Sequence, residues 1–504
     1  MEATLRIDPA FTVGPVRRRT FGSFVEHLGR CVYTGIYEPG HPTADEQGFR
    51  GDVLDLVREM GVSTVRYPGG NFVSGYRWED GIGPVESRPK RLDLAWHSLE
   101  PNEVGTDEFM AWAKKAGVEP MMAINLGTRG VLEAVDIVEY CNVPAGSDWA
   151  ERRRTNGADD PYRVKMWCLG NEMDGPWQMG HKTPAEYGRI ATEAARAMRM
   201  IDPDLELVAC GSSGRGMETF GEWERVVLTE AYDQIDMISA HAYYWEKDSG
   251  LQEFLVSAED MDRFIDQVGA TIDAVAAARK TDKKIGISFD EWNVWYIDRD
   301  PSKRPTGDDW PIAPRLLEDN YSVADAVVVG NRLISLLRHT DRVWSASQAQ
   351  LVNVIAPIMA EPGGPVWKQT TFHPFALTSA NARGDVVRVL VDGPTIETGQ
   401  FGDVQALDAV ATWADDGAAV FVVNRHATEA VEAQIELPAG CSLVQALTLH
   451  HVDPSWKASA DDDSSVGVEP NETARLDDRT LSVTLPPISW TMITLGKRPL
   501  RVSS

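Results

Sequence analysis

Two short apolar runs of this chain each end in a glutamate, which could bring two carboxylic acids into one site. The first run is Trp167-Cys-Leu-Gly-Asn-Glu172, and the second is Ile287-Ser-Phe-Asp-Glu291. Each run suits a buried parallel strand, and parallel-barrel enzymes carry their chemistry at the carboxyl ends of strands. Two carboxyl groups about 5 Å apart can cleave a glycosidic bond, because one protonates the leaving oxygen while the other attacks the sugar carbon. The sequence therefore predicts a glycosidase with Glu172 and Glu291 as its catalytic pair.

The residues beside these two glutamates suit a sugar site. Asn171 precedes Glu172, and its amide can form a hydrogen bond with a sugar hydroxyl. Trp295 lies shortly after Glu291 and offers an apolar wall to a sugar ring. Asp290 and Glu291 should point to opposite sides of their strand, so we expect only one of them to face the cleft.

Eight strand-like runs alternate with amphipathic segments, which is typical of a (β/α)8 TIM barrel. Helix start signals support this interpretation: Thr183-Pro-Ala-Glu186 combines a capping box with proline at the first helical position. Thr106 is expected to cap a helix over residues 107–116. The expected barrel strands cover residues 20–26, 62–67, 119–125, 165–170, 206–210, 237–242, 284–289 and 342–346.

After about residue 356 the sequence changes to short strands with alternating apolar residues, including 386–391, 418–424 and 489–495. This pattern is typical of a β-sandwich, and we expect a jelly-roll-like domain that also takes in the opening strand at residues 3–7. Residues 454–479 contain few apolar side chains and predict a long loop. The predicted parts are an N-terminal strand in 1–18, a catalytic barrel in 19–360 and a β-sandwich domain in 361–504.

Composition limits the partners of the protein. The chain has 504 residues and 43% hydrophobic content, which is enough for a barrel and a second domain. Its net charge of −27 repels a polyanion, so we expect no nucleic-acid partner and favour a neutral substrate.

Signals for export, membrane insertion and metal binding are not apparent in the sequence. The N-terminus lacks a basic region followed by an apolar stretch, and no run of about 18 apolar residues occurs. Five scattered cysteines without CxxC spacing predict reduced thiols, so we expect a cytoplasmic protein with no membrane partner. No HExxH or paired-histidine spacing supports a metal site, and we expect no metal and no cofactor. The residues that could be imagined as ligands at one barrel mouth are Glu172, His241, Asp290 and Glu291.

Several longer motifs carry a family resemblance over nearly the whole chain. They are Phe21-Gly-Ser-Phe-Val-Glu26-His27, Val65-Arg66-Tyr-Pro-Gly-Gly-Asn71-Phe72, Leu94-Ala-Trp96, Gly170-Asn171-Glu172 and Gln350-Leu-Val-Asn353. With these motifs the chain resembles the glycoside hydrolase family 51 α-L-arabinofuranosidases. In that family the two catalytic glutamates follow the fourth and seventh strands of the barrel, as Glu172 and Glu291 do in our strand order.

The resemblance implies a retaining exo-α-L-arabinofuranosidase that removes terminal non-reducing arabinofuranosyl residues from arabinan- or arabinoxylan-derived oligosaccharides. It implies that Glu172 is the acid/base and Glu291 the nucleophile, and that the protein forms a homo-oligomer, in this family usually a hexamer. It also implies a set of residues that bind the furanose: Glu26, Arg66, Asn71, Asn171, Tyr243 and Gln350.

Other assignments around the site stay open at this point. Tyr243 and His241 lie on the same face of an extended strand, and each could form a hydrogen bond with Glu291. Gln348 and Gln350 would share a face in a regular strand, so a bulge or turn must decide which one reaches the sugar. Glu26 can accept a hydrogen bond from the sugar or from Arg66. Trp96 and Trp295 are expected to form walls of the cleft.

Two other functions remain compatible with the sequence. One is a β-1,4-endoglucanase of the same family, which would need an open groove rather than a pocket around one sugar. The other is a carbohydrate-binding protein without activity. The loop over residues 296–314 follows the strand of Glu291 and is expected to hang over the cleft, where it would influence which leaving group fits.

Overall fold

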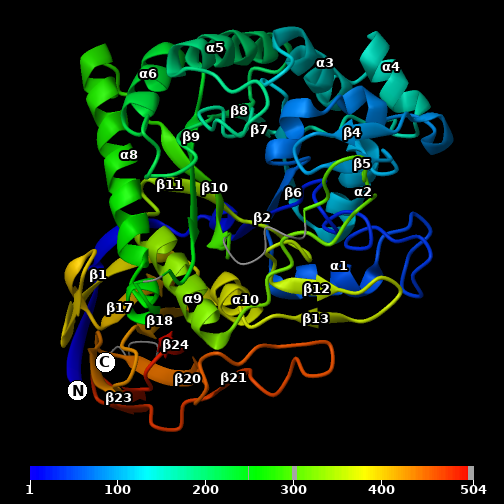
Figure 1. Ribbon diagram of the computed structural model, residues 1–504. Helices are drawn as coiled ribbons and strands as arrows, with labels where there is room; N and C mark the ends of the chain where they lie inside the picture. Colours follow the sequence, from blue (N-terminus) through cyan, green and yellow to red (C-terminus); the bar gives the residue numbers. More distant parts are fainter. Residues whose placement is uncertain (248, 298–303, 498–504) are drawn as a thin grey trace, which may run out of the picture.

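The core of the molecule is a closed barrel of eight parallel strands (Figure 1). The computed structural model describes residues 1–247, 249–297 and 304–497. Each barrel strand pairs with its sequence neighbour among the eight, and the last pairs with the first, so the predicted (β/α)8 barrel is confirmed. The strands are β2 (Gly22–Phe24), β3 (Thr64–Tyr67), β6 (Glu119–Ala123), β7 (Met166–Leu169), β8 (Glu206–Ala209), β9 (Met237–Tyr244), β10 (Gly286–Val294) and β11 (Val343–Gln348).

Helices surround the barrel and follow its strands. They are α1 (Gly51–Met60), α2 (Thr106–Ala116), α3 (Val131–Asn142), α4 (Asp148–Thr155), α5 (Pro184–Ile201), α6 (Glu222–Ala231), α7 (Leu251–Leu255), α8 (Ala258–Arg279), α9 (Val323–Arg338) and α10 (Phe372–Asn381). Within the described ranges, no helix combines the length and apolarity that crossing a membrane requires.

The helix start predicted at Thr183 is confirmed, and the one at Thr106 is wrong by one residue. Thr183 and Glu186 form a capping box at the start of α5. In α2, Thr106 is the first helical residue and Gly105 is the cap, whose amide donates to Glu108 at 2.8 Å. The chain passes so close to Gly81 that a Cβ on residue 105 would lie 1.8 Å from the Gly81 carbonyl oxygen. Packing therefore requires glycine at this cap.

Several short helices and hairpins lie outside the barrel strands and the large sheet. The 3-10 helices are η1 (Arg18–Phe21), η2 (Asn71–Gly75), η3 (Trp78–Gly81) and η4 (Val85–Ser87). Three two-stranded hairpins pair β4 (Arg91–Asp93) with β5 (Ser98–Glu100), β12 (Ile358–Ala360) with β13 (Val366–Lys368), and β15 (Thr395–Thr398) with β16 (Gly402–Gln405).

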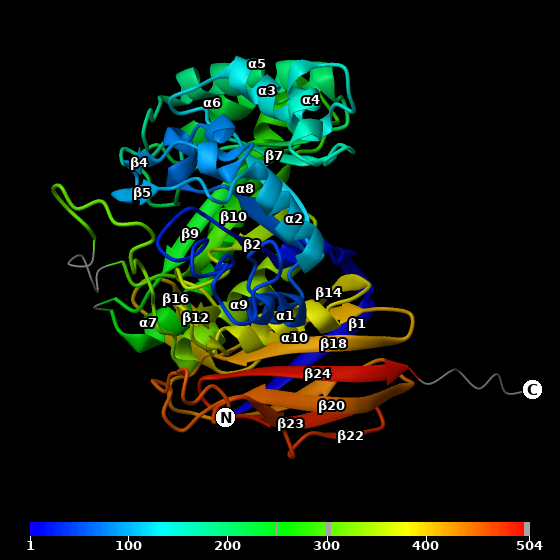
Figure 2. The same ribbon diagram turned by 90° about the vertical axis from the view of Figure 1, so that its right-hand side faces the viewer.

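The C-terminal strands form one curled, mixed sheet of ten strands, and the N-terminal strand lies inside it as predicted. β1 pairs antiparallel with β14 and parallel with β19, so the chain start is fixed on both sides. Figure 2 shows β1 in blue crossing the layer of orange and red strands. The strands are β1 (Glu2–Pro15), β14 (Asp385–Asp392), β17 (Leu407–Trp413), β18 (Gly417–Asn424), β19 (Val431–Glu436), β20 (Cys441–Leu449), β21 (Val468–Pro470), β22 (Arg475–Asp477), β23 (Thr480–Leu485) and β24 (Ser489–Lys497).

The prediction of a long loop over residues 454–479 is wrong in part, because this segment contains two of these strands, β21 and β22. β21 pairs with β20, and β22 pairs with β23. Ala474 and Leu476 contact the apolar interior of the curled sheet, which explains how a polar segment gains pairing partners.

The curled sheet packs against the barrel through α9 and α10 (Figure 1). Alternate residues of β18 serve two cores: Val420 and Val422 face the interior of the sheet, while Phe421 faces the barrel side. α10 also contacts α1 of the barrel, although it follows residue 360 in sequence. The division of the chain at residue 360 stays a prediction.

Candidate active site

A cleft of about 950 Å³ opens at the carboxyl ends of the barrel strands. Most of the residues predicted for the site line it, although they come from six different strand ends or the loops after them. Arg66 and Asn171 are buried beside the glutamates and are not among the lining residues. The predicted residues that line the cleft are Glu26, Asn71, Trp96, Glu172, His241, Tyr243, Glu291, Trp295 and Gln350.

Glu172 reaches the cleft through a sharp turn after β7. Gly170 has φ +98° and Glu172 itself has φ +42°, a left-handed conformation that is uncommon for a residue with a side chain. Two side chains then fix its carboxylate: His241 Nδ1 lies 3.0 Å from Oε1, and Trp177 Nε1 donates to Oε2 at 2.7 Å. The sequence reasoning missed Trp177, for which the only available signal was a tryptophan five residues after Glu172.

Glu291 is held by two hydrogen bonds near the end of β10. Arg66 Nη1 donates to its Oε1 at 2.6 Å and Tyr243 OH donates to its Oε2 at 2.6 Å, so the predicted tyrosine contact is present. Arg66 pairs with Glu291 and with Asn171, not with Glu26. Burial alone would raise the pKa of Glu291, but the charges of His241 and Arg66 and the Tyr243 hydroxyl lower it below its usual value. The Glu291 carboxylate is thus kept ionised.

Asp290 takes no part in lining the cleft. Its carboxyl contacts Ser288 and lies 3.7 Å from Cys168 Sγ, inside the barrel. Burial raises the pKa of Asp290, which disfavours its charged form. The expectation that only one of the two neighbouring acids faces the cleft is confirmed.

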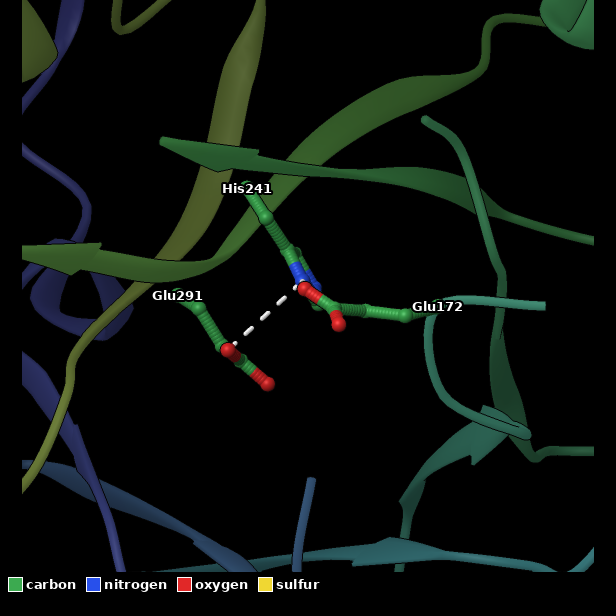
Figure 3. A group of neighbouring side chains, drawn as sticks. All are labelled: Glu172, His241 and Glu291. Carbon is green, nitrogen blue, oxygen red and sulfur yellow. Dashed lines mark hydrogen bonds and ion pairs between the residues drawn. The ribbon is translucent and has the colours of Figure 1, made fainter. Parts of the chain in front are cut away.

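His241 lies between the two glutamates, as Figure 3 shows. Its Nδ1 is 3.0 Å from Glu172 and 3.7 Å from Glu291. Burial lowers its pKa, but the charge of Glu291 and the hydrogen bond to Glu172 outweigh this and raise the pKa of His241. One atom from each of the three side chains lies within 4.8 Å of the others. One carboxylate oxygen of Glu172 thus lies within 4.8 Å of one of Glu291, which agrees with the spacing of about 5 Å that direct attack by a carboxylate needs.

Glu26 anchors the opposite side of the cleft. Its carboxylate accepts from Phe72 N at 3.0 Å, Trp96 Nε1 at 2.9 Å and Gln350 Nε2 at 2.8 Å. Burial raises the pKa of Glu26 to about 8. Gln350 reaches the cleft because β11 ends at Gln348, whose amide instead turns toward Asn293.

Aromatic side chains form the walls of the cleft. Trp96 lines one wall and is fixed by its bond to Glu26. Trp295 lies edge-on to Tyr243, with ring centres 5.0 Å apart.

The loop predicted over residues 296–314 lies only partly within the described residues, because 298–303 are outside them. In its described part, Trp310 stacks on His97 at 3.7 Å, and Pro311 O accepts from Leu99 N at 3.0 Å. Arg304 and Ile297 line the cleft, so described parts of this loop lie at its edge.

Glu172, His241 and Glu291 are close enough to contact one cation. Each carboxylate already has partners, however, and the Arg66 guanidinium lies 2.6 Å from Glu291. A second cation beside that guanidinium would meet electrostatic repulsion in a buried site. These three side chains therefore suit a hydrogen-bonded group, with His241 between the two acids, better than a metal site.

The barrel and the cleft together define the class of the protein. Two carboxylic acids at the ends of the fourth and seventh barrel strands, within 4.8 Å of one another, are the arrangement of a (β/α)8 glycoside hydrolase.

Comparisons with known proteins identify the family within this class. A model of the α-L-arabinofuranosidase 1 domain matches residues 56–267, and one of the α-L-arabinofuranosidase C-terminal domain matches residues 290–489. An intracellular exo-α-(1→5)-L-arabinofuranosidase of Streptomyces lividans is 56% identical over 97% of this chain and 75% of its own length. An exo-α-(1→6)-L-arabinofuranosidase of Bifidobacterium longum is 54% identical over 98% of this chain and 97% of its own length. The chain belongs to the glycoside hydrolase family 51 α-L-arabinofuranosidases, as its motifs predicted.

Solved structures agree with this assignment. A family 51 α-L-arabinofuranosidase from Bifidobacterium longum has a TM-score of 0.94 and 50% identity, and covers 98% of this chain and 99% of its own. An α-L-arabinofuranosidase from Thermotoga maritima in complex with arabinose has a TM-score of 0.87 and 34% identity, over 98% of this chain and 100% of its own.

Proposed function

We propose that the protein removes terminal non-reducing α-L-arabinofuranosyl residues from arabino-oligosaccharides by double displacement, with net retention at the anomeric carbon. The observation that carries this proposal is that two carboxylates with oxygens within 4.8 Å of one another have different hydrogen-bond partners. Arg66 and Tyr243 keep Glu291 ionised, as a nucleophile must be. Glu172 contacts only His241 and Trp177 and has no guanidinium partner among the described residues.

In the first step, Glu291 attacks the anomeric carbon while Glu172 donates its proton to the departing oxygen. This forms an ester between Glu291 and the arabinosyl group, and the leaving alcohol departs neutral. In the second step, the Glu172 carboxylate removes a proton from a water molecule, and that water breaks the ester. Glu172 is then protonated and Glu291 is ionised again, so both acids return to their starting states.

The remaining polar groups of the cleft bind the furanose in this proposal. Glu26, Asn71 and Gln350 lie together at the ends of β2, β3 and β11, where they can reach sugar hydroxyls. Arg66 and Asn171 are buried beneath the cleft surface, where they position Glu291 and Asn71 by hydrogen bonds. His241 links the two acids.

The relatives named above differ in linkage, since one is named for α-(1→5) and another for α-(1→6) bonds. Both names specify exo action on arabinofuranosides, which favours this activity over an endoglucanase or a protein that only binds sugars. We propose α-(1→5)-linked arabino-oligosaccharides as substrates, because three relatives between 49% and 56% identical carry that name.

The decisive experiment follows 4-nitrophenol release from the aryl α-L-arabinofuranoside, beside the β-cellobioside, with EDTA present. We expect release from the arabinoside alone, and proton NMR should show the α-anomer as the first product. Glu291→Ala should abolish turnover. Glu172→Gln should lower kcat/KM for α-(1→5)-arabinobiose by roughly 10²–10⁴-fold but lower kcat/KM for the aryl substrate much less, since nitrophenolate leaves in the first step without protonation. The second step still lacks its base, so kcat for the aryl substrate should fall as well.

Several results of this experiment would contradict the proposal. A first product of inverted configuration would refute double displacement. Equal losses on both substrates would refute the role of Glu172, and loss of activity in EDTA would indicate a metal. Preference for the cellobioside would assign the endoglucanase activity instead.

We also propose that the protein acts in the cytoplasm as a homo-oligomer, with a hexamer as the expected assembly. Relatives named intracellular support the location. Cell fractionation would test it, and enzyme activity confined to the medium would contradict it.

A further inference from the structure

The cleft continues beyond the catalytic pair into a second region, which we call the distal lobe. Its lining residues come from four segments: the loop after β8, the end of β9, α7 with the start of α8, and the turn between β15 and β16. The distal lobe consists of Arg215, Tyr244, Glu253, Asp260, Gln400 and Phe401.

The strand order of the barrel places the distal lobe on the side of the leaving group. Glu26, Asn71 and Gln350 follow β2, β3 and β11, which are neighbours in the barrel. Arg215 follows β8, which pairs with β7, the strand before Glu172, and Tyr244 ends β9, which pairs with β8. Both strands lie across the barrel mouth from β2. Because the acid protonates the oxygen of the leaving group, that group must lie beside Glu172, and the region after β8 and β9 is the part of the cleft that lies across from Glu26, Asn71 and Gln350.

A hairpin of the C-terminal domain closes the distal lobe. Figure 2 shows β16 beside α7, and the backbone amide of Gly399 in the hairpin turn donates to Glu253 Oε1. Phe401 packs against an apolar cluster that joins Val256 of the barrel to Ile396 and Val404 of the hairpin. The turn is therefore anchored, and Gln400 and Phe401 are fixed at the edge of the cleft.

The floor of the distal lobe is a polar network in which one guanidinium is paired with one carboxylate. Asp260 accepts from Arg215 Nε at 2.8 Å and from Tyr244 OH at 3.1 Å. The guanidinium of Arg332 covers the Tyr244 ring at 3.7 Å. A pair of opposite charges beside aromatic rings suits a neutral polyhydroxyl ligand, because sugar hydroxyls bond to charged groups while the ring faces pack on aromatics.

One acceptor in the distal lobe is unused. Glu253 Oε2 is buried and has no hydrogen-bond partner in the part of the chain that the structure describes. A buried carboxylate oxygen without a donor has lost its water contacts without replacing them, which is unfavourable. A ligand hydroxyl that donates to this oxygen would remove that penalty.

The volume of the cleft also exceeds the need of one pentose. About 950 Å³ lies near the top of the range of roughly 300–1,000 Å³ that accommodates ligands of drug size. An arabinofuranosyl residue at the catalytic pair leaves space for further sugar units.

We propose that the distal lobe binds the leaving-group part of a neutral arabino-oligosaccharide, so that the β15–β16 hairpin of the C-terminal domain helps to select oligosaccharides over simple arabinosides. This inference rests on the proposed hydrolysis. Phe401 and Gln400 are its specificity-determining residues, and Glu253 Oε2 is the acceptor for one hydroxyl of the oligosaccharide.

The test compares α-(1→5)-arabinotriose with the aryl α-L-arabinofuranoside. In Phe401→Ala and in Gln400→Ala, the ratio of kcat/KM for the triose to kcat/KM for the aryl substrate should fall about three- to tenfold, which corresponds to the loss of one packing or hydrogen-bonding contact. Asp403→Ala is the matched control, since Asp403 is exposed in the same hairpin and does not line the cleft. Its ratio should equal that of the wild type.

A binding measurement separates this inference from the proposed hydrolysis. Titration calorimetry of arabinotriose into Glu291→Gln reads binding without turnover, and adding Phe401→Ala or Gln400→Ala should weaken it by a similar factor. Unchanged ratios and unchanged binding in both variants would overturn the role of the distal lobe. A wild-type protein that binds arabinotriose through the lobe but cleaves neither substrate would refute the hydrolysis and leave the lobe supported.

Discussion

At the scale of single residues, the two glutamates that we propose as the catalytic pair differ in the partners that surround them. Glu291 accepts from a guanidinium and from a phenol, whereas Glu172 contacts a histidine and an indole. Cationic and hydroxyl donors stabilise the ionised form of a carboxyl group, and in Glu291 they lower the pKa despite burial. His241 couples the two acids, because its pKa is raised mainly by the charge of Glu291 and then by its bond to Glu172.

Tyr243→Phe should move the acidic limb of the pH profile to higher pH. The Tyr243 hydroxyl is one of the groups that lower the pKa of Glu291, so its loss raises that pKa. The nucleophile must be ionised, and activity therefore appears only at higher pH than in the wild type. The measurement is kcat/KM for the aryl arabinofuranoside between pH 3 and 8 (about the range of a carboxyl titration).

Tyr244→Phe is the matched control for this substitution, because the neighbouring Tyr244 hydroxyl donates to Asp260 instead of Glu291. Its acidic limb should coincide with that of the wild type. If the limb stays in place in Tyr243→Phe as well, or moves to lower pH, the hydroxyl does not stabilise the ionised nucleophile.

At the scale of elements, α9 is the helix that joins the barrel to the curled sheet. Every residue from Val323 to Leu337 is buried, because one side of the helix covers β10 and β11 and the other meets β17, β18 and β24. Gly330 makes the closest approach. A Cβ at this position would lie 2.2 Å from Cδ1 of Trp490 in β24.

Gly330→Ala should destabilise the protein by about 1–3 kcal/mol, because the added methyl group overpacks a buried aromatic contact that cannot move freely. Thermal unfolding measures the effect as a lowered Tm. The aryl arabinosidase activity of the folded fraction should persist, since Trp490 does not line the cleft.

Gly269→Ala is the matched control, since it makes the same substitution inside α8. There a Cβ would lie 3.6 Å from Arg342 Nε, which is an ordinary contact. Alanine is a better helix former than glycine, so this variant should be as stable as the wild type or up to about 1 kcal/mol more stable. Equal Tm values for the two variants would contradict the tight contact between α9 and β24.

At the scale of the whole molecule, the C-terminal sheet supports the barrel and also reaches the cleft. Its outer face packs on α9 and α10, while the β15–β16 hairpin lines the cleft with Gln400 and Phe401. The N-terminal strand β1 lies between β14 and β19, so the first and the last described strands of the chain both belong to this sheet. The C-terminal part of the chain therefore both packs against the barrel and contributes residues to the lining of the cleft.

The predicted assembly is tested by light scattering at neutral pH. A hexamer would have six times the chain mass of 55.6 kDa. The net charge of −27 opposes association between copies, so salt at about 0.15 M or above should favour the oligomer by screening this repulsion. A monomer mass across all salt concentrations would remove this prediction.

The alternation of apolar runs was enough to predict all eight barrel strands, because buried parallel strands have to be apolar along their whole length. Strand ends were predicted to within about five residues: Glu172 follows β7 as expected, whereas Glu291 lies inside β10, which continues to Val294 rather than ending at residue 289. The cap at Gly105 was missed, since the close approach of Gly81 that requires glycine there is a contact between segments far apart in the chain. Trp177 was missed for a different reason: it lies only five residues after Glu172, but the geometry of the turn after β7 decides that its indole reaches the carboxylate.

The sequence by itself determined the fold class and the family, and it singled out the two glutamates that we propose as the catalytic pair, because strand periodicity and short motifs are local properties of the chain. Only the tertiary structure decided which partners each glutamate has, that Gln350 rather than Gln348 reaches the cleft, and that Arg66 pairs with Glu291. It alone brought the β15–β16 hairpin to the cleft. These contacts join residues up to hundreds of positions apart, and their geometry depends on how the barrel closes and how the sheet packs against it.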